Sequence, residues 1–343
     1  MRTLTMLMAS TALLGGLMIG PSFADSSYSF KLVKKIALPT KAGHGDGVVY
    51  DPSNKYVYVS MVDGMAVVDT KTNTVVHAFS AKEIPAPNYM AFDDDYVYET
   101  VAEGKGKRNQ IVVISKKTWK IVDTVTTAGT SPDGAFADPA NKRFYVVSDD
   151  ANWIEAWTTG AHPTHIANYP EPVKNPVAGP DVASLHGGTI YGVNDSYLFK
   201  MNPSNGAIDG AVNYHLKVLK HGGTKANIWD AASNEVWVAT THHVVLVVDP
   251  KTLDIVDILP QSKGADDIEQ DPGLGLAYTF QSSLPGFEVY DMKALKRIAT
   301  VKTGTKHPTH TGVIDPDNHD VYAYVGGEAA LWVYEPVKGT AMK

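Results

Sequence analysis

The chain of 343 residues contains no cysteine. Without thiols it can form no disulfide, no thiolate metal site, no cysteine-linked haem and no cysteine nucleophile. Its stability must therefore come from the burial of a hydrophobic core. With 44% hydrophobic residues, the chain has enough apolar surface for this.

Clustered positive charge is also scarce. The 30 Lys and Arg residues are outnumbered by 37 Asp and Glu, which gives a formal net charge of −7, and the one compact basic group is "KGKR" at 105–108. Sequence-independent binding to nucleic acid relies on clustered Lys and Arg. We therefore expect no nucleic-acid partner.

Long apolar runs are missing after the first residues. Residues 1–24 carry Arg2, then the apolar stretch "LLGGLMIG", and end in "SFA" at Ala24, which is the layout of a secretory signal peptide. An N-terminal anchor helix is the alternative, but the apolar stretch is shorter than the roughly 20 residues that span a bilayer. We expect cleavage after Ala24, which removes Arg2 and leaves residues 25–343 with a net charge of −8 as one domain. The mature protein is then expected to be periplasmic and monomeric, without a membrane span.

Short apolar runs separated by turns are abundant, and they repeat. An Asp, a short loop and a Tyr/Val-rich run recur, and we call the Asp of each copy the marker Asp. The marker residues are Asp51, Asp93, Asp138, Asp230, Asp271 and Asp315, at intervals of 42, 45, 92, 41 and 44 residues. The interval of 92 spans two units, and "VASLHGGTIYGV" (182–193) fits the missing copy with a shortened turn. The chain therefore contains seven copies.

A second hairpin pattern, such as "AVVDTKTNTVV" around Asp69 and "LVVDPKTLDIV" around Asp249, follows the first in most copies. Two hairpins per copy give four strands every 41 to 46 residues, which is typical of a β-propeller blade. The seventh copy ends after three strands, and the extra strand pattern at 28–38, with Phe30, Leu32 and Ile36, would complete it. The sequence therefore predicts an all-β fold, a seven-bladed propeller of four-stranded antiparallel blades closed by the N-terminal strand. An open solenoid is the alternative.

These motifs resemble the blades of YVTN-type (YncE-like) β-propellers of the bacterial periplasm. The resemblance covers the Asp-Pro lead-in, the Tyr-Val strand and the "VVDTKTNTVV" hairpin, and it extends over essentially the whole mature chain. It implies the propeller fold and a periplasmic location. It implies little about activity, because propellers carry many functions.

The repeat also predicts where a site lies. In a propeller the inner strand of each blade begins near the axis on one face, which we call the mouth. The residues five positions before each marker, with Asp181 for the degenerate fourth copy, should form one polar ring there and bind a ligand: Asp46, Asn88, Asp133, Asp181, Lys225, Asp266 and His310. The alternative is that these side chains only cap turns.

Histidines near the same face suggest a metal site. Asp and His side chains bind zinc, copper or manganese, and a divalent metal would relieve the repulsion among the carboxylates. The candidate ligands are His44, His221, His242, His307, His310 and Asp266.

Composition and motifs favour a binding protein, for a small ligand, a metal ion or a periplasmic protein partner, over an enzyme. The chain has no Gly-x-Ser-x-Gly elbow and no phosphate-binding loop. The alternative is a propeller enzyme with its site at the same mouth, either a lactonase-like hydrolase or a quinoprotein-like oxidoreductase. Thr309 stands where the lactonase-type lead-in would have Arg, which makes phosphorylated-lactone chemistry a poor match.

Overall fold

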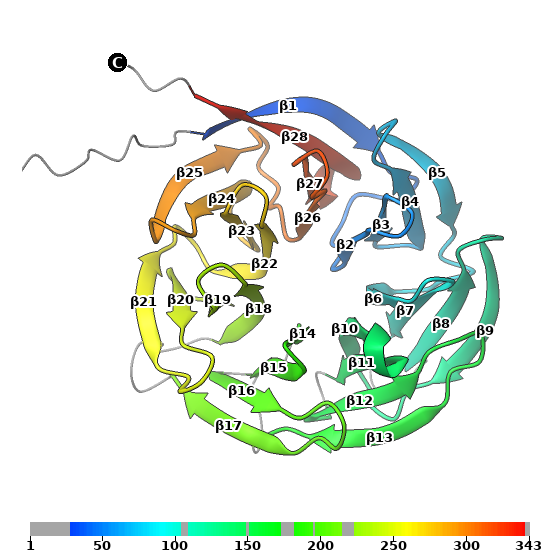
Figure 1. The fold of residues 1–343 in the computed structure, drawn as a ribbon. Coiled ribbons are helices and arrows are strands. Elements are labelled where there is room, and N and C mark those ends of the chain that lie inside the picture. The colour runs from blue at the N-terminus through cyan, green and yellow to red at the C-terminus, as the bar shows by residue number, and fades with distance from the viewer. Residues whose placement is uncertain are drawn as a thin grey trace, which may run out of the picture.

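The computed structural model describes residues 28–103, 109–148, 151–172, 182–194, 196–214 and 223–339. These residues form seven four-stranded antiparallel sheets, arranged as blades around a central axis (Figure 1). The prediction of an all-β, seven-bladed propeller is therefore confirmed.

The strands of each blade run in sequence order from the axis outward, except in the seventh. The first three blades are β2 (Val48–Asp51), β3 (Tyr56–Ser60), β4 (Met65–Asp69), β5 (Thr74–Phe79); β6 (Pro87–Phe92), β7 (Tyr96–Ala102), β8 (Asn109–Ser115), β9 (Lys120–Thr126); and β10 (Pro132–Asp138), β11 (Arg143–Ser148), β12 (Trp153–Thr158), β13 (His165–Pro170). The next three are β14 (Ser184–His186), β15 (Thr189–Asn194), β16 (Tyr197–Met201), β17 (Ile208–Asn213); β18 (Thr224–Asp230), β19 (Glu235–Thr240), β20 (Val244–Val248), β21 (Ile255–Pro260); and β22 (Ala265–Asp271), β23 (Leu276–Gln281), β24 (Gly286–Asp291), β25 (Lys296–Lys302). The seventh blade is β26 (Gly312–Ile314), β27 (Val321–Val325), β28 (Ala330–Lys338) and, outermost, β1 (Tyr28–Ala37). Two short 3-10 helices, η1 (Pro139–Asn141) and η2 (Gly326–Glu328), lie in turns.

The marker Asp residues form the turns on the face opposite the mouth, which we call the far face. Asp51 Oδ1 accepts a hydrogen bond from the backbone N–H of Ser53 at 2.9 Å, and Asp271 Oδ1 accepts one from the N–H of Leu274 at 3.0 Å. An Asp side chain that bonds the backbone two or three residues later stabilises a tight turn. The same bond is made by Asp93, Asp138, Asp230 and Asp315. The repeated Asp is thus a structural residue.

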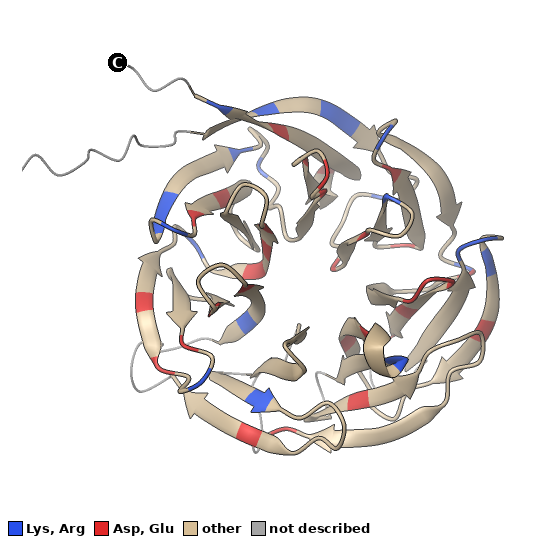
Figure 2. Ribbon diagram, viewed as in Figure 1, with Lys and Arg blue, Asp and Glu red and all other residues tan. Residues whose placement is uncertain are grey.

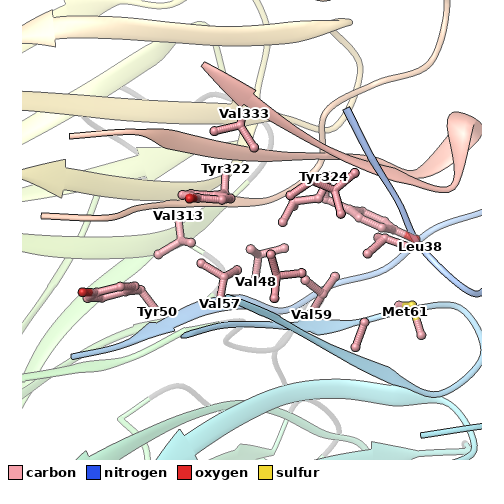
Figure 3. Packing of buried hydrophobic residues seen from close by; sticks show 14 residues of the cluster. Leu38, Val48, Tyr50, Val57, Val59, Met61, Val313, Tyr322, Tyr324 and Val333 are labelled. Carbon is pink, nitrogen blue, oxygen red and sulfur yellow. The ribbon is translucent and has the colours of Figure 1, made fainter. Parts of the chain in front are cut away.

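The hydrophobic core lies between neighbouring blades. Middle strands such as β23 and β27 are buried at every residue because both of their faces are covered, whereas outer strands such as β9 alternate between more and less exposed residues. Figure 3 shows one such interface, where Val313 and Tyr322 of the last blade face Val48 and Val57 of the first. Each blade is therefore stable only with its neighbours.

The N-terminal strand closes the ring as predicted, with one difference. β1 pairs with β28 from Tyr28 opposite Lys338 to Ala37 opposite Ala330, and the register shifts between Leu32 and Lys34. Because this bulge reverses the alternation, Phe30 packs against β23 and β24, while Ile36 joins the core shared with the first blade. Leu32, the third apolar residue of the predicted strand, is 37% exposed.

We expect His186 to make the free energy of unfolding depend on pH. It ends β14 and its ring stacks on Trp229, with centroids 5.9 Å apart. Burial lowers the pKa of His186 to about 4. As the pH falls from about 6.5, the unfolded chain takes up this proton first, so the stability that the neutral ring contributes is lost between about pH 6.5 and 4.

We therefore expect the free energy of unfolding to fall by up to about 3 kcal/mol over that range because of this group. His186→Phe keeps a ring on Trp229 and should remove that part of the pH dependence. Urea unfolding of both proteins at several pH values measures it. Identical pH profiles would show that His186 does not titrate in this way.

No helix among the described residues is long and apolar enough to cross a membrane. The predicted signal peptide, residues 1–24, lies outside the described part of the chain. The basic group at 105–108 also lies outside it.

Candidate functional site

A cavity of about 480 Å³ opens at the mouth of the ring. Six of the seven predicted ring residues line it: Asp46, Asn88, Asp133, Lys225, Asp266 and His310. Asp181, the seventh, lies outside the described residues. Figure 2 shows acidic segments on β22 and a basic segment on β18 beside the axis. The structure thus brings side chains from six blades to one cavity.

Four inner strands have an irregular pairing register where these side chains lie. The pairing register shifts between Pro87 and Met90 in the second blade and between Pro132 and Ala135 in the third, and similar shifts occur in the fifth and sixth blades. A β-bulge bends its strand and changes the direction of a side chain. The shifts in the four blades bracket Asn88, Asp133, Lys225 and Asp266.

His310 is the centre of a connected group of side chains. Its Nδ1 is 2.7 Å from Oδ2 of Asp266, and its Nε2 is 3.1 Å from Oδ1 of Asp46. The same Asp46 oxygen is 3.2 Å from Nδ1 of His44, and the centroids of the two imidazole rings are 3.8 Å apart. We call these four residues the His310 cluster.

The two carboxylates control the protonation of His310. Burial lowers the pKa of the imidazole, but the hydrogen bonds and charges of Asp266 and Asp46 outweigh it and raise the pKa of His310 to about 10. Burial also raises the pKa of the Asp46 and Asp266 carboxyl groups, but their cationic neighbours lower it by more. These neighbours are His310 and His44 at Asp46, and His310 and Lys225 at Asp266. The pKa of Asp46 ends well below its usual value, and that of Asp266 ends below it. At neutral pH His310 is therefore a cation that lies between two carboxylates.

The other lining residues also make contacts between blades. Lys225 Nζ lies 3.7 Å from Oδ1 of Asp266, and Nδ2 of Asn88 donates to the carbonyl oxygen of Pro132 at 3.1 Å. The side chains of Asp46 and Asp266 contact His310 or Lys225 from other blades, so turn capping alone does not account for the two aspartates.

A second cavity, of about 760 Å³, extends along the axis toward the far face. Tyr89, Val182 and Asp267 line both cavities and so form a neck between them. Burial raises the pKa of Asp267 and of Glu269, and the charge of Asp267 adds to the shift at Glu269. Burial, with the charges of these carboxyl groups, also raises the pKa of Tyr89. The carboxyl groups of Asp267 and Glu269 thus have raised pKa values, in contrast to the lowered values of Asp46 and Asp266.

The structure does not bring every predicted metal ligand to the cavity. The ring of His307 packs against Gly327, and His242 lies in the turn between β19 and β20; neither lines the cavity. His221 lies outside the described residues. Of the predicted ligands, His44 and His310 meet in the cluster and Asp266 supports His310, while Asp46, expected only as a ligand-binding residue, lies between the two histidines.

Two buried Glu residues that shape the mouth were not predicted. Glu155 Oε1 accepts a hydrogen bond from the N–H of Gly129 at 2.6 Å, and Glu288 Oε2 accepts one from the N–H of Ser262 at 3.1 Å. Both side chains are buried, and they hold the loops that lead to two of the cavity aspartates. The signal was present in the sequence, because each is a single Glu within an apolar strand, in "WIEAW" and "GFEVY".

In comparisons with protein-family models and with curated proteins, nothing matches this chain. The chemistry of the site must therefore be argued from its geometry. The cavity offers carboxylate oxygens, imidazole nitrogens and one ammonium group to a bound molecule. Such a set can hold a cation or a small polar ligand with several hydrogen-bond donors.

Proposed function

We propose that this chain is a binding propeller that takes a cation or a small cationic molecule in the mouth cavity, without chemistry of its own. The observation that carries the proposal is the convergence of one repeat position from six blades on a single cavity. Its volume of about 480 Å³ suits a small molecule. Its polar lining suits a small, charged ligand better than an apolar one.

The charges of the lining favour a positive ligand. Asp46, Asp133 and Asp266 bring three carboxylates to the cavity. Lys225 contacts Asp266, and His310 contacts both Asp266 and Asp46, so these two cations stand against three carboxylates. Carboxylates held close together are stabilised by a cation between them.

The proposal includes a periplasmic location and the likeness to YVTN-type propellers. The signal-peptide layout of residues 1–24 supports the first, and the repeated Asp and Tyr/Val pattern supports the second. A periplasmic protein is a further possible partner. The location is tested by the mass of the exported protein, which should begin at Asp25; a mass that retains residues 1–24 would argue against it.

Asp133→Asn is expected to weaken the binding of small cations, because it removes one charge from the cavity and keeps the size of the side chain. We expect a loss of roughly five-fold in affinity, equivalent to about 1 kcal/mol. Calorimetric titration of residues 25–343 with calcium chloride, putrescine and agmatine gives the dissociation constants.

Asp63→Asn is the matched control. Asp63 lies in the turn between β3 and β4 at the mouth, pairs with Lys41 at 3.0 Å, and is not part of the cavity lining. The change at Asp63 should leave affinity unaltered. Equal affinities of the two variants, or no binding of any cation to the unaltered protein, would remove the support for the proposed function.

A propeller enzyme is the second candidate, because the His310–Asp266 pair has the arrangement of a base with an orienting carboxylate. A general base must be free of its proton near the working pH. With a pKa of about 10, His310 retains its proton at neutral pH, so we rank binding first. Lactone hydrolysis that disappears in His310→Gln would reverse this order.

A further inference from the structure

Three donor atoms of the His310 cluster have the separations of ligands around one metal ion. Asp46 Oδ1 is 3.2 Å from Nδ1 of His44 and 3.1 Å from Nε2 of His310. One ligand atom from each of the three residues lies within 4.8 Å of the other two. Around tetrahedral zinc, with bonds of about 2.0–2.2 Å, neighbouring ligand atoms are roughly 3.3 Å apart. The two separations from Asp46 therefore match those around zinc, and the three donor atoms lie close enough together to share one ion.

Asp266 supplies a second, independent feature of metal sites. A histidine that binds metal through one ring nitrogen commonly donates its other N–H to a carboxylate, which fixes the tautomer and the orientation of the ring. In His310, Nδ1 lies 2.7 Å from Oδ2 of Asp266 and Nε2 lies 3.1 Å from Oδ1 of Asp46, so one nitrogen is close to a supporting carboxylate and the other is placed for a metal. Asp266 lies close to Lys225 in turn, so its own position is also supported.

We propose that His44, Asp46 and His310 bind one divalent transition-metal ion, with Asp266 as the residue that positions the His310 ring. This inference rests on the proposed function and names its ligand. Two imidazole nitrogens and one carboxylate oxygen suit zinc or copper, whereas calcium and magnesium take oxygen ligands. The cavity beside the cluster leaves a fourth coordination position for water or a small ligand.

Metal binding exchanges the ion for a proton. The Nε2 proton of His310 leaves to solvent and the metal takes its place next to Asp46, while the Nδ1 proton stays on the nitrogen that faces Asp266. The dication then neutralises Asp46 as the imidazolium did. The side chain of His44 is 60% exposed, so its ring can turn toward the ion without disturbing the core.

The test uses residues 25–343 made without a His tag and stripped with a chelator. Titration with zinc chloride against a competing chelator of known affinity should give one zinc per chain. His44→Gln removes an exposed ligand without affecting the fold, and should lower zinc affinity at least ten-fold. Asp266→Asn should lower it about 10- to 100-fold. In the cobalt(II) form, Asp266→Asn should also shift the visible absorption bands, which a purely structural role would leave unchanged.

His243→Gln is the matched control. His243 is exposed, lies in the mouth turn between β19 and β20, and donates from Nδ1 to the carbonyl oxygen of Ser262. The zinc affinity of the His243→Gln protein should equal that of the unaltered protein. Zinc binding that is unchanged in His44→Gln, or no tighter than calcium binding, overturns the inference. If calcium or putrescine still binds and depends on Asp133, only the metal assignment fails; if no cation binds, the proposed function fails as well.

Discussion

A variant that lacks residues 28–38 is expected to aggregate or to lose most of its thermal stability. β1 is the outer strand of the last blade, and its loss exposes the whole edge of β28 between Ala330 and Lys338. It also removes Phe30 and Ile36 from two inter-blade contacts. An open edge beside uncovered apolar surface promotes association between chains. Thermal unfolding and gel filtration of residues 25–343, with and without residues 28–38, measure the effect.

Two point variants within β1 serve as internal controls. Ile36→Ala removes a side chain that is 4% exposed and should cost about 2–5 kcal/mol. Leu32→Ala removes one that is 37% exposed and should cost less than about 1 kcal/mol. A deletion variant as stable as residues 25–343 would disprove closure by β1, and equal effects at the two positions would disprove the bulge.

Lys116→Met is expected to lower the free energy of unfolding by about 3–5 kcal/mol. Lys116 follows β8 in the second blade, and its Nζ lies 2.5 Å from Oδ2 of Asp51 at the end of β2 in the first. Their side chains are 7% and 3% exposed. Methionine keeps the length of the side chain but leaves a buried carboxylate without its cation, which is the costly way to break such a pair. Urea unfolding measures the change.

The neighbouring residue provides the control. Lys117 is exposed, so Lys117→Met makes the same chemical change in solvent and should alter stability by less than about 0.5 kcal/mol. Adding Asp51→Asn to Lys116→Met should cost less than the sum of the single changes, because the carboxylate that lacks a partner is then gone. Equal effects of Lys116→Met and Lys117→Met would show that the ion pair does not stabilise the interface.

The fold could be predicted because its information is local and repeated. Each marker Asp bonds its own turn within two or three residues, and Asp249 does the same in a second hairpin by accepting from the N–H of Lys251 at 2.7 Å. Seven copies of such a unit, each apolar on both faces, can bury those faces only against one another. The exposure of Leu32 could not be predicted, because a bulge is not visible in an alternating pattern.

The location of the site was also predictable, because equivalent positions of a repeat lie at equivalent places around the ring. Which of its side chains contact one another could not be predicted from the sequence. His44 and His310 are far apart in the sequence, and their ring centroids lie 3.8 Å apart only because the last blade packs against the first. His242 and His307 lie in loops of the same face, but neither side chain lines the cavity.

By itself the sequence determined the number of blades, the turns, the strand that closes the ring and the positions that line the mouth. Only the tertiary structure decided which side chains touch: His310 with Asp46 and Asp266, and Lys116 with Asp51. The physical reason is the range of the interactions. Turns and strand patterns depend on neighbouring residues, whereas the distance between side chains of different blades depends on ring closure and on the bulges that turn four of the inner strands at the mouth.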